Sequence, residues 1–256
     1  MQRTVIILTM PRSGSSLLAG ILHRLGIPMG SDSDLQKGQH LNKHGCHEDQ
    51  WFQSISLNIL FESRLLLDIS RRLDMDEAQV KAVVEKYRPE IEKYVNSRDQ
   101  KVWGFKDPGL IYHLPHYHDF FENPYYIHLI RNTKDTAGSL YKTFRPAYWW
   151  PEFKDKFSLF TPRNRFMTIF RSISLFLNRQ QDYNQREAFE RVIEHGHQRI
   201  RDFIRDKKHI TIQLEDLLDE PRTQVAKVQK FVGLDSERDK LSSALAFIDP
   251  NLVNSY

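Results

Sequence analysis

The stretch that most constrains the fold is TVIILTMPRSGSSLLAGILHRLG, which runs from Thr4 to Gly26. Residues 4–9 form a continuous, largely β-branched run, as in a strand buried on both faces of a parallel sheet. Residues 15–25 place their leucine and isoleucine side chains on one helical face, and Gly26 then provides a stop signal. A strand that passes through a short polar loop into a helix has the outline of a phosphate-binding loop.

The rest of the chain alternates between strand and helix patterns. Strands are predicted over 101–106, 125–131 and 209–214. Helices are predicted over 49–69, 77–96 with a break or bend near Pro89, 133–142 with Thr133 as N-cap, 164–205 as one or two helices, 221–232 and 236–247. Residues 31–48 and 144–153 are predicted to be loops. Without a linker-like stretch, residues 1–256 are predicted to form a single α/β domain, a three-layer, P-loop-like arrangement in which helices flank a mainly parallel central sheet.

The loop after the first strand has the side chains of an anion site. Ligands of such sheets bind at the carboxyl ends of the strands, and the first amides of the following helix have no intrahelical partners. Gly14 allows close backbone approach, and Arg12 adds a fork of donors suited to phosphate or sulfate. The predicted anion cradle comprises Pro11, Arg12, Ser13, Gly14, Ser15 and Ser16. The alternative is a plain turn capped by serine, which has little need for Arg12.

The end of this loop argues against a magnesium-bound nucleotide. Nucleotide hydrolases place Lys and then Ser or Thr at this point, with the hydroxyl on Mg²⁺. Position 15 holds Ser where that Lys would stand. We therefore expect the anion cradle to work without a metal.

A second strand-to-helix junction repeats the pattern. In YYIHLIRNTKDTAGSLYK, Arg131 closes a strand, Lys134 follows, and Ser139 lies two helical turns further on. Arg131 could instead cap the C-terminus of a neighbouring helix. Two strand-end arginines favour a ligand with two separate anionic groups, one held at Arg12 and the other at Arg131 and Ser139.

Charge and cysteine content narrow the partners and the compartment. The formal net charge of +4 is mildly basic and scattered, which suits an anionic ligand but not a nucleic-acid partner. Cys46 is the single cysteine, so no internal disulfide can form and a reducing, cytoplasmic location is expected. No stretch approaches the roughly 18 apolar residues that span a bilayer, and the apolar run before Pro11 is too short for a signal peptide. We therefore expect no stable membrane insertion.

Together the two junctions resemble those of sulfotransferases that use 3′-phosphoadenosine 5′-phosphosulfate (PAPS). PRSGSSLLAGILHRLG is similar to the 5′-phosphosulfate loop of the bacterial, carbohydrate-sulfotransferase-like branch, and IRNTKDTAGSLYK is similar to the 3′-phosphate segment. That segment usually contains Arg-Asp-Pro. Asn132 and Thr133 replace Asp-Pro in the turn and leave the ligand positions, Arg131 and Ser139, unchanged.

Three more segments extend the resemblance to about residues 4–145 and 209–233. They are NKHGCHED, WGFKDPGLIYHLP and ITIQLEDLLDEP. The first of them matches the family pattern at Asn42, Gly45, Glu48 and Asp49 but not at Lys43 and Cys46. The glycine-rich carboxy-terminal clamp of the family's cytosolic branch is absent. The role of residues 234–256 is therefore left open.

The resemblance implies in-line transfer of a sulfuryl group from PAPS to a hydroxyl or amine, with adenosine 3′,5′-bisphosphate (PAP) as the other product. Negative charge builds on the bridging oxygen, so fixed donors there are the main catalytic resource. Arg12, Lys106 and the amides of 13–16 are assigned to it. Glu48 is the predicted general base for the acceptor.

Each of these assignments has an alternative. Glu48 could be a carboxylate at the start of the helix near residue 49, and Lys106 could be a solvated strand end. His44, His47 and Asp107 are reserve bases, although Asp107 could instead order the turn at Pro108. Glu215 is expected to cap or orient the late turn rather than to act in catalysis.

Two side-chain clusters admit further interpretations. One consists of four residues of the types that bind zinc, namely His40, His44, Cys46 and His47. Their spacing fits no usual zinc pattern, so no metal is predicted and the loop is taken as solvated or acceptor-facing. AYWWPEF, residues 147–153, is predicted to be a packed aromatic cluster or a lid over the acceptor.

The leading hypothesis is a PAPS-dependent sulfotransferase with a small-molecule, carbohydrate or lipid acceptor. A nucleotide-dependent kinase is an alternative, against which the missing Lys-Ser ending counts. A non-catalytic anion-binding or nucleic-acid-binding domain is another, against which the lack of clustered basic runs counts. The loops 31–48 and 144–153 fit a sugar, a phenol or a lipid headgroup alike.

Overall fold

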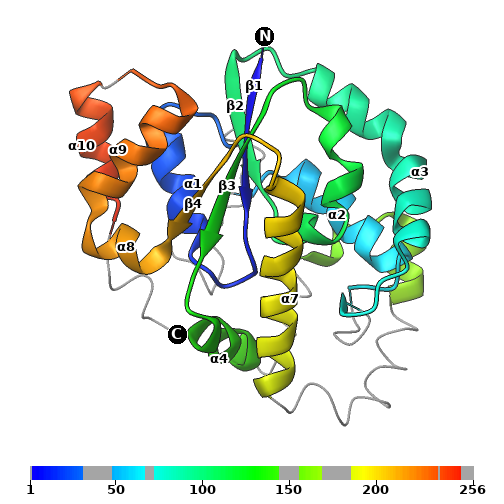
Figure 1. Cartoon of the computed structure of the whole chain (residues 1–256). Helices are drawn as coiled ribbons and strands as arrows, with labels where there is room; N and C mark the ends of the chain where they lie inside the picture. The colour runs from blue at the N-terminus through cyan, green and yellow to red at the C-terminus, as the bar shows by residue number, and fades with distance from the viewer. Residues whose placement is uncertain are drawn as a thin grey trace.

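The computed structural model describes residues 2–30, 48–66, 72–143, 156–168, 186–235 and 237–248. Within these residues, a four-stranded parallel sheet of order β2-β1-β3-β4 forms the centre (Figure 1). The strands are β1 (Arg3–Leu8), β2 (Val102–Lys106), β3 (Pro124–Ile130) and β4 (His209–Gln213). The four predicted strands are thereby confirmed, each with ends within one residue of the prediction.

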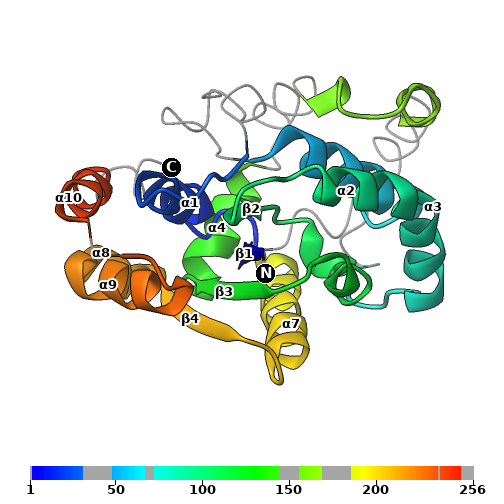
Figure 2. The ribbon, with the colours of Figure 1, turned by 90° about the horizontal axis from the view of Figure 1, so that it is seen from above.

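Helices cover both faces of the sheet, as the view from above shows (Figure 2). One face carries α1 (Ser15–Arg24), α8 (Leu214–Asp219), α9 (Pro221–Val232) and α10 (Arg238–Ala246). The other carries α2 (Gln50–Glu62), α3 (Glu77–Asn96), α7 (Arg186–Ile204) and three 3₁₀ turns, Leu110–Tyr112, Leu114–His116 and His118–Phe120. The helix α4 (Thr133–Thr143) lies at the end of the sheet to which the strand arrowheads point (Figure 1). The predicted three-layer α/β architecture is confirmed.

The continuous apolar run of β1 is explained by its central position. Val5 and Ile7 join the core under α1, whereas Ile6 and Leu8 join the core under α2 and α3. All four side chains are fully buried. Burial of such a side chain stabilises the fold by roughly 1.5–3 kcal/mol, so both cores depend on this strand.

The order of the strands fixes where a ligand can bind. β1 pairs with β2 on one side and with β3 on the other. The strand order therefore reverses between β1 and β3, and in open α/β sheets the ligand crevice lies outside the carboxyl ends at such a point. Both predicted anion-binding junctions, one after β1 and one after β3, lie at this reversal.

Several helix predictions need correction. The helix predicted over 49–69 ends at Glu62, because the chain turns at Arg64 into a left-handed conformation with φ of 62°. The helix α3 continues through Pro89 without a break. Asn132, rather than Thr133, caps α4, since its Oδ1 accepts hydrogen bonds from the amides of residues 134 and 135 at 2.9 and 3.3 Å.

Two further differences concern the second half of the chain. The short helix α8 was not predicted, because its six residues directly follow a strand without a turn signal. The helix predicted over 164–205 is described in two parts, residues 162–168 and α7, and residues 169–185 lie outside the described part. The helices α9 and α10 agree with their predictions within two residues at each end.

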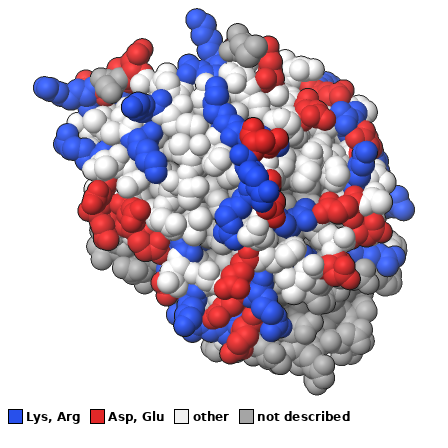
Figure 3. Space-filling model, in the orientation of Figure 1, with Lys and Arg blue, Asp and Glu red and all other residues white. Residues whose placement is uncertain are grey.

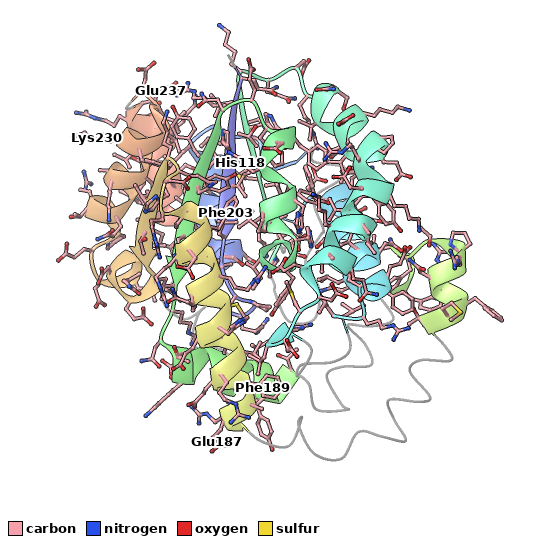
Figure 4. All side chains as sticks on the ribbon, turned by 45° about the vertical axis from the view of Figure 1, so that its right-hand side comes forward. His118, Glu187, Phe189, Phe203, Lys230 and Glu237 are labelled. Carbon is pink, nitrogen blue, oxygen red and sulfur yellow. The ribbon has the colours of Figure 1, made fainter. Side chains whose placement is uncertain are left out.

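The last described residues pack on the helix that follows the anion cradle. The ring of Phe247 covers Gly20 of α1 so closely that a Cβ there would lie 2.1 Å from a ring carbon. The guanidinium carbon of Arg24 lies 3.6 Å from the centre of the same ring. Lys230 and Glu237 mark the outer surface of this layer (Figure 4). The carboxy-terminal helix thus supports α1, and residues 249–256 lie outside the described part.

Acidification is expected to weaken the fold through a buried histidine pair. His128 on β3 and His197 on α7 are joined at 2.9 Å between Nε2 and Nδ1, and both are buried. Burial, followed by nearby positive charge, lowers the pKa of His128 to about 3 and that of His197 to about 4. The unfolded chain takes up these protons below about pH 6.5, whereas the folded chain does not. The free energy of unfolding should therefore fall between about pH 6.5 and pH 4.

Urea unfolding at stepped pH checks this prediction. The variant His128→Asn with His197→Gln should show a flatter pH dependence than the parent chain. His209→Gln, which removes an exposed imidazole whose charge is the weakest of those acting on His128, is the comparison variant and should change the slope less than the double variant does. An unchanged slope in the double variant would contradict the prediction.

Candidate active site

The loop after β1 has a backbone shape suited to anion binding. Arg12 and Gly14 both adopt left-handed conformations, with φ of 70° and 80°. Gly14 is also the N-cap of α1, and no side chain caps this end of the helix. A Cβ on Gly14 would lie 2.7 Å from the side chain of Leu214, so the position requires glycine for space as well as for conformation. The amides at the start of α1 therefore have no side-chain cap, which is the property that an anion site at this loop would require.

The serines of the loop differ in their surroundings. Ser13 and Ser15 are buried, and the Ser13 hydroxyl has no hydrogen-bond partner among the described residues. Ser16 is partly exposed, and its Oγ accepts a hydrogen bond from Lys106 Nζ at 3.3 Å. Pro11 lies in the turn that leads from β1 into the loop. A buried hydroxyl without a partner costs free energy, which a bound oxyanion beside the loop would recover.

The structure brings the two predicted anion-binding junctions into contact. Arg12 Nε donates a hydrogen bond to Ser139 Oγ on α4 at 3.1 Å. Arg131 Nη1 donates to the carbonyl oxygen of Arg12 at 3.1 Å. This bond ties Arg131 to the loop, unlike the alternative in which it caps a neighbouring helix. Residues separated by more than 100 positions in the sequence thus form one positively charged site.

A buried ion pair lies beside the loop. Lys106 Nζ at the end of β2 is 2.6 Å from Glu48 Oε1, and its side chain is 3% exposed. Lys106 is therefore not the solvated strand end of the alternative interpretation. Gln53 Nε2 donates a hydrogen bond to Glu48 Oε2. Because Lys106 also reaches Ser16, it bridges the anion cradle and the Glu48 carboxylate.

The Glu48 carboxylate is held in its ionised form. Burial alone would raise the pKa of Glu48. The positive charges of Lys106 and Lys156, together with hydrogen bonds from Lys106 and Gln53, outweigh burial and place the pKa below its ordinary value. An ionised carboxylate next to the anion cradle can take a proton from the hydroxyl group of a molecule bound there.

Asp107, one of the reserve bases, has a role in the turn. Its Oδ1 accepts a hydrogen bond from the amide of Gly109 at 2.8 Å, which is the turn-ordering contact expected before Pro108. Burial raises the pKa of Asp107 to about 6, with the nearby charge of Glu48 acting in the same direction. The Ser56 hydroxyl and the Gly109 amide act against this rise.

The residue next to Glu48 anchors this part of the chain. Asp49 caps α2 by accepting hydrogen bonds from the amides of residues 51 and 52 at 3.0 and 3.1 Å. Its other oxygen accepts from Arg98 at 2.6 Å and from the Tyr94 hydroxyl at 2.7 Å, both on or next to α3. The helix cap is therefore Asp49 and not Glu48, which leaves Glu48 free to pair with Lys106.

Glu215 contacts a different turn from the late one that it was predicted to cap or orient. Its Oε1 accepts a hydrogen bond from the amide of Asn132 at 2.9 Å, and thereby joins α8 to the turn that follows β3. Asn132 in turn caps α4, the helix that carries Ser139. The replacement of Asp-Pro by Asn-Thr in this turn is thus accommodated by side-chain contacts of Asn132.

The sequence interpretation missed Gln53, which contacts Glu48, and Lys156, a second lysine whose charge acts on Glu48. Gln53 has a detectable signal, since it lies one helical turn after the Asp49 cap, whereas Lys156 has none within its own segment. The cluster of His40, His44, Cys46 and His47 and the aromatic stretch 147–153 lie outside the described residues.

Two searches are restricted to the part of the chain that the structure describes. There, three or more His, Cys, Asp or Glu side chains nowhere gather in a way that could hold a metal ion. No helix in the same residues is long and apolar enough to cross a membrane.

Comparisons with known proteins bear on the fold and the family of the chain. Among solved structures, the chain is similar to the sulfotransferase domain from the Synechococcus PCC 7002 olefin synthase, with 20% identity, a TM-score of 0.50, and 99% of this chain and 82% of that chain covered. It is also similar to the sulfotransferase domain from the curacin biosynthetic pathway, with 17% identity, a TM-score of 0.53, and 99% and 86% covered. At these identities the likeness shows the fold.

The family itself is shown by a separate comparison. No curated protein is significantly similar to the chain. The profile of the family described as the sulfotransferase domain, in contrast, matches residues 2–248. This match includes the loop after β1, the junction after β3 and the Lys106–Glu48 pair, and the chain therefore belongs to the sulfotransferase domain family, whose members are enzymes of sulfuryl transfer.

Proposed function

We propose that the chain transfers a sulfuryl group from PAPS to a hydroxyl or amine of a small-molecule, carbohydrate or lipid acceptor. The contact of Arg12 with both Ser139 and the Arg131 junction carries this proposal. This contact offers one donor-rich site for a ligand with two anionic groups, as PAPS has. The bacterial, carbohydrate-sulfotransferase-like branch remains our proposal on the loop sequence PRSGSS.

We assign roles by position. The cofactor site comprises Pro11, Arg12, Ser13, Gly14, Ser15, Ser16, Arg131 and Ser139. Arg12 and Lys106 stabilise the charge that develops on the bridging oxygen, and Glu48 takes the acceptor proton. Lys106 is suited to this role because it lies between Ser16 of the loop and Glu48. We further propose a single domain over 1–256 and a cytoplasmic location, the latter because of the single cysteine.

The nucleic-acid alternative receives less support from the charges. On the face shown in Figure 3, Lys and Arg side chains are interspersed with Asp and Glu rather than gathered in one basic patch. Ion pairs such as Arg199 with Glu77 at 2.7 Å and Arg205 with Asp202 at 2.7 Å neutralise part of the basic charge. A nucleic-acid surface usually keeps its basic side chains available for phosphates.

Calorimetry with PAP tests the proposed function. We expect saturable binding of PAP in the presence of a chelator, with no gain on adding Mg²⁺, because Arg12, Arg131 and the amides of α1 supply the donors. ATP with Mg²⁺ is the comparison ligand and should bind more weakly. Absence of PAP binding, or a strict requirement for Mg²⁺, would exclude the proposal.

The variant Glu48→Gln is expected to separate binding from turnover. Gln retains the size and one hydrogen-bond acceptor but cannot take the acceptor proton, so kcat should fall by roughly 10²–10⁴-fold. The affinity for PAP should remain within about twofold, because the anion cradle is formed by other residues. Single-turnover assays with PAPS, once an acceptor is found by screening a panel, measure the first effect. Parental turnover in this variant would remove Glu48 from the mechanism.

A further inference from the structure

A polar stripe runs along one side of α2. Ser54, Asn58 and Glu62 are spaced four residues apart, so they lie on the same helical face. Within an otherwise largely buried and apolar helix, such a stripe needs polar partners. The segment 158–164 supplies these partners.

The hydrogen bonds pin this segment to α2 at several points. Ser54 Oγ donates to the carbonyl oxygen of Leu159 at 2.6 Å, and Asn58 Nδ2 donates to the same oxygen at 3.1 Å. Asn58 Oδ1 accepts from the amide of Thr161 at 3.0 Å and from Asn164 Nδ2 at 2.7 Å. Asn58 and Asn164 are both buried, which makes these bonds costly to break.

The contacts also define a direction. Asn164 contacts Asn58 and Glu62, Thr161 contacts Asn58, and Leu159 contacts Ser54. The segment therefore runs in the same direction as α2, and its earlier residues approach the start of that helix. Lys156 precedes Leu159 by one turn, as the hydrogen bond from the Leu159 amide to the Lys156 carbonyl oxygen at 3.0 Å shows. The start of α2 is where Glu48 lies.

The charges around Glu48 agree with this placement. Lys106 at the end of β2 pairs with Glu48 directly, and Asp107 follows it in the chain. Gln53 of α2 donates to the other carboxylate oxygen. Lys156 is the second positive charge that acts on Glu48, and like Lys106 it lowers the pKa of the carboxyl group.

We propose that Lys156 is a positioning residue for the reaction and that α2 holds it next to Glu48. In this position Lys156 provides the Glu48 carboxylate with a cationic partner when Lys106 turns toward the sulfuryl group. The proposal rests on the proposed function of Lys106 and Glu48. If Lys106 serves both the donor and Glu48, its charge is shared between them when PAPS is bound. A second lysine then keeps Glu48 ionised and ready to accept a proton.

The test is a pH titration of the Glu48 carboxyl group in the full chain. Carbon-13 NMR of the glutamate carboxyl groups monitors the titration, and the signal that disappears in Glu48→Gln identifies Glu48. In Lys156→Met the pKa of Glu48 should rise by about one unit relative to the parent chain. Lys156→Arg should keep the parental value. Ser54→Ala, which removes one anchor of the segment, should shift the pKa in the same direction by less.

Arg163→Met is the matched control, because it removes an exposed cation from the same segment and should leave the Glu48 titration unchanged. PAP affinity should stay within about twofold in every variant, because the anion cradle is untouched. An unchanged Glu48 titration in Lys156→Met, or an equal shift in Arg163→Met, would overturn the proposal. A shifted titration with unchanged pH dependence of kcat/KM would support the placement of Lys156 and instead refute Glu48 as the general base.

Discussion

Replacing Arg12 by alanine is expected to lower the affinity for PAP by on the order of 100-fold. Arg12 is the residue at which the two anion-binding junctions meet. Its Nε donates a hydrogen bond to Ser139, and its carbonyl oxygen accepts one from Arg131. Hydrogen bonds between a guanidinium and a charged ligand contribute about 1.5–3 kcal/mol each, and loss of the side chain removes at least one of them. Calorimetric titration of PAP into the parent chain and the variant measures the change.

Two further substitutions separate charge, geometry and backbone strain at this position. Arg12→Lys keeps the charge without the fork of donors and should recover only part of the affinity. Arg12→Gly should bind PAP as poorly as Arg12→Ala but unfold at a higher temperature than it, because φ of 70° is strained for any side chain with a Cβ. A higher unfolding temperature for Arg12→Gly than for Arg12→Ala, at equal affinity, would show that this position stores backbone strain. Parental affinity in Arg12→Ala would contradict the assignment.

The local half of this site could be predicted from the sequence. The apolar run of β1, the glycine at position 14 and the helical period of α1 each act within a few residues, so the pattern alone indicates a strand, a loop and a helix. The same holds for β3 and α4. The spatial meeting of Arg12 with Ser139 follows only from the order of the strands, which places the ends of β1 and β3 side by side.

The other half depends on competition between neighbouring side chains. Glu48 and Asp49 are both plausible caps for α2, and the contacts of Asp49 with Arg98 and Tyr94 of a distant segment decide between them. The early end of α2 similarly depends on the left-handed turn at Arg64, a residue type with no intrinsic preference for that conformation. Lys156 is brought to Glu48 by Asn58, more than 90 residues away in sequence, and no local pattern encodes that contact.

Lys106→Met is expected to cost both stability and turnover. The substitution leaves the Glu48 carboxylate buried and deprived of its direct partner, which typically destabilises a fold by about 3–5 kcal/mol. We expect the lower end of this range, because Lys156 still acts on Glu48. Turnover should fall by roughly 10²–10³-fold, since a fixed donor near the bridging oxygen is lost. Urea unfolding and single-turnover assays measure the two effects.

The dependence on pH and a double variant distinguish an unpaired charge from simple loss of packing. In the parent chain the pKa of Glu48 lies below its ordinary value, so its ion pair stabilises the fold at neutral pH and this stabilisation is lost as the pH falls through that lowered pKa. In Lys106→Met, burial raises the pKa of Glu48, so the stability deficit should be largest at neutral pH and shrink below about pH 5, where the carboxyl is neutral. Adding Glu48→Gln to Lys106→Met should restore most of the stability at pH 7 while turnover stays low. A deficit that is independent of pH, or a double variant no more stable than Lys106→Met, would show that Lys106 acts through packing and not through its charge.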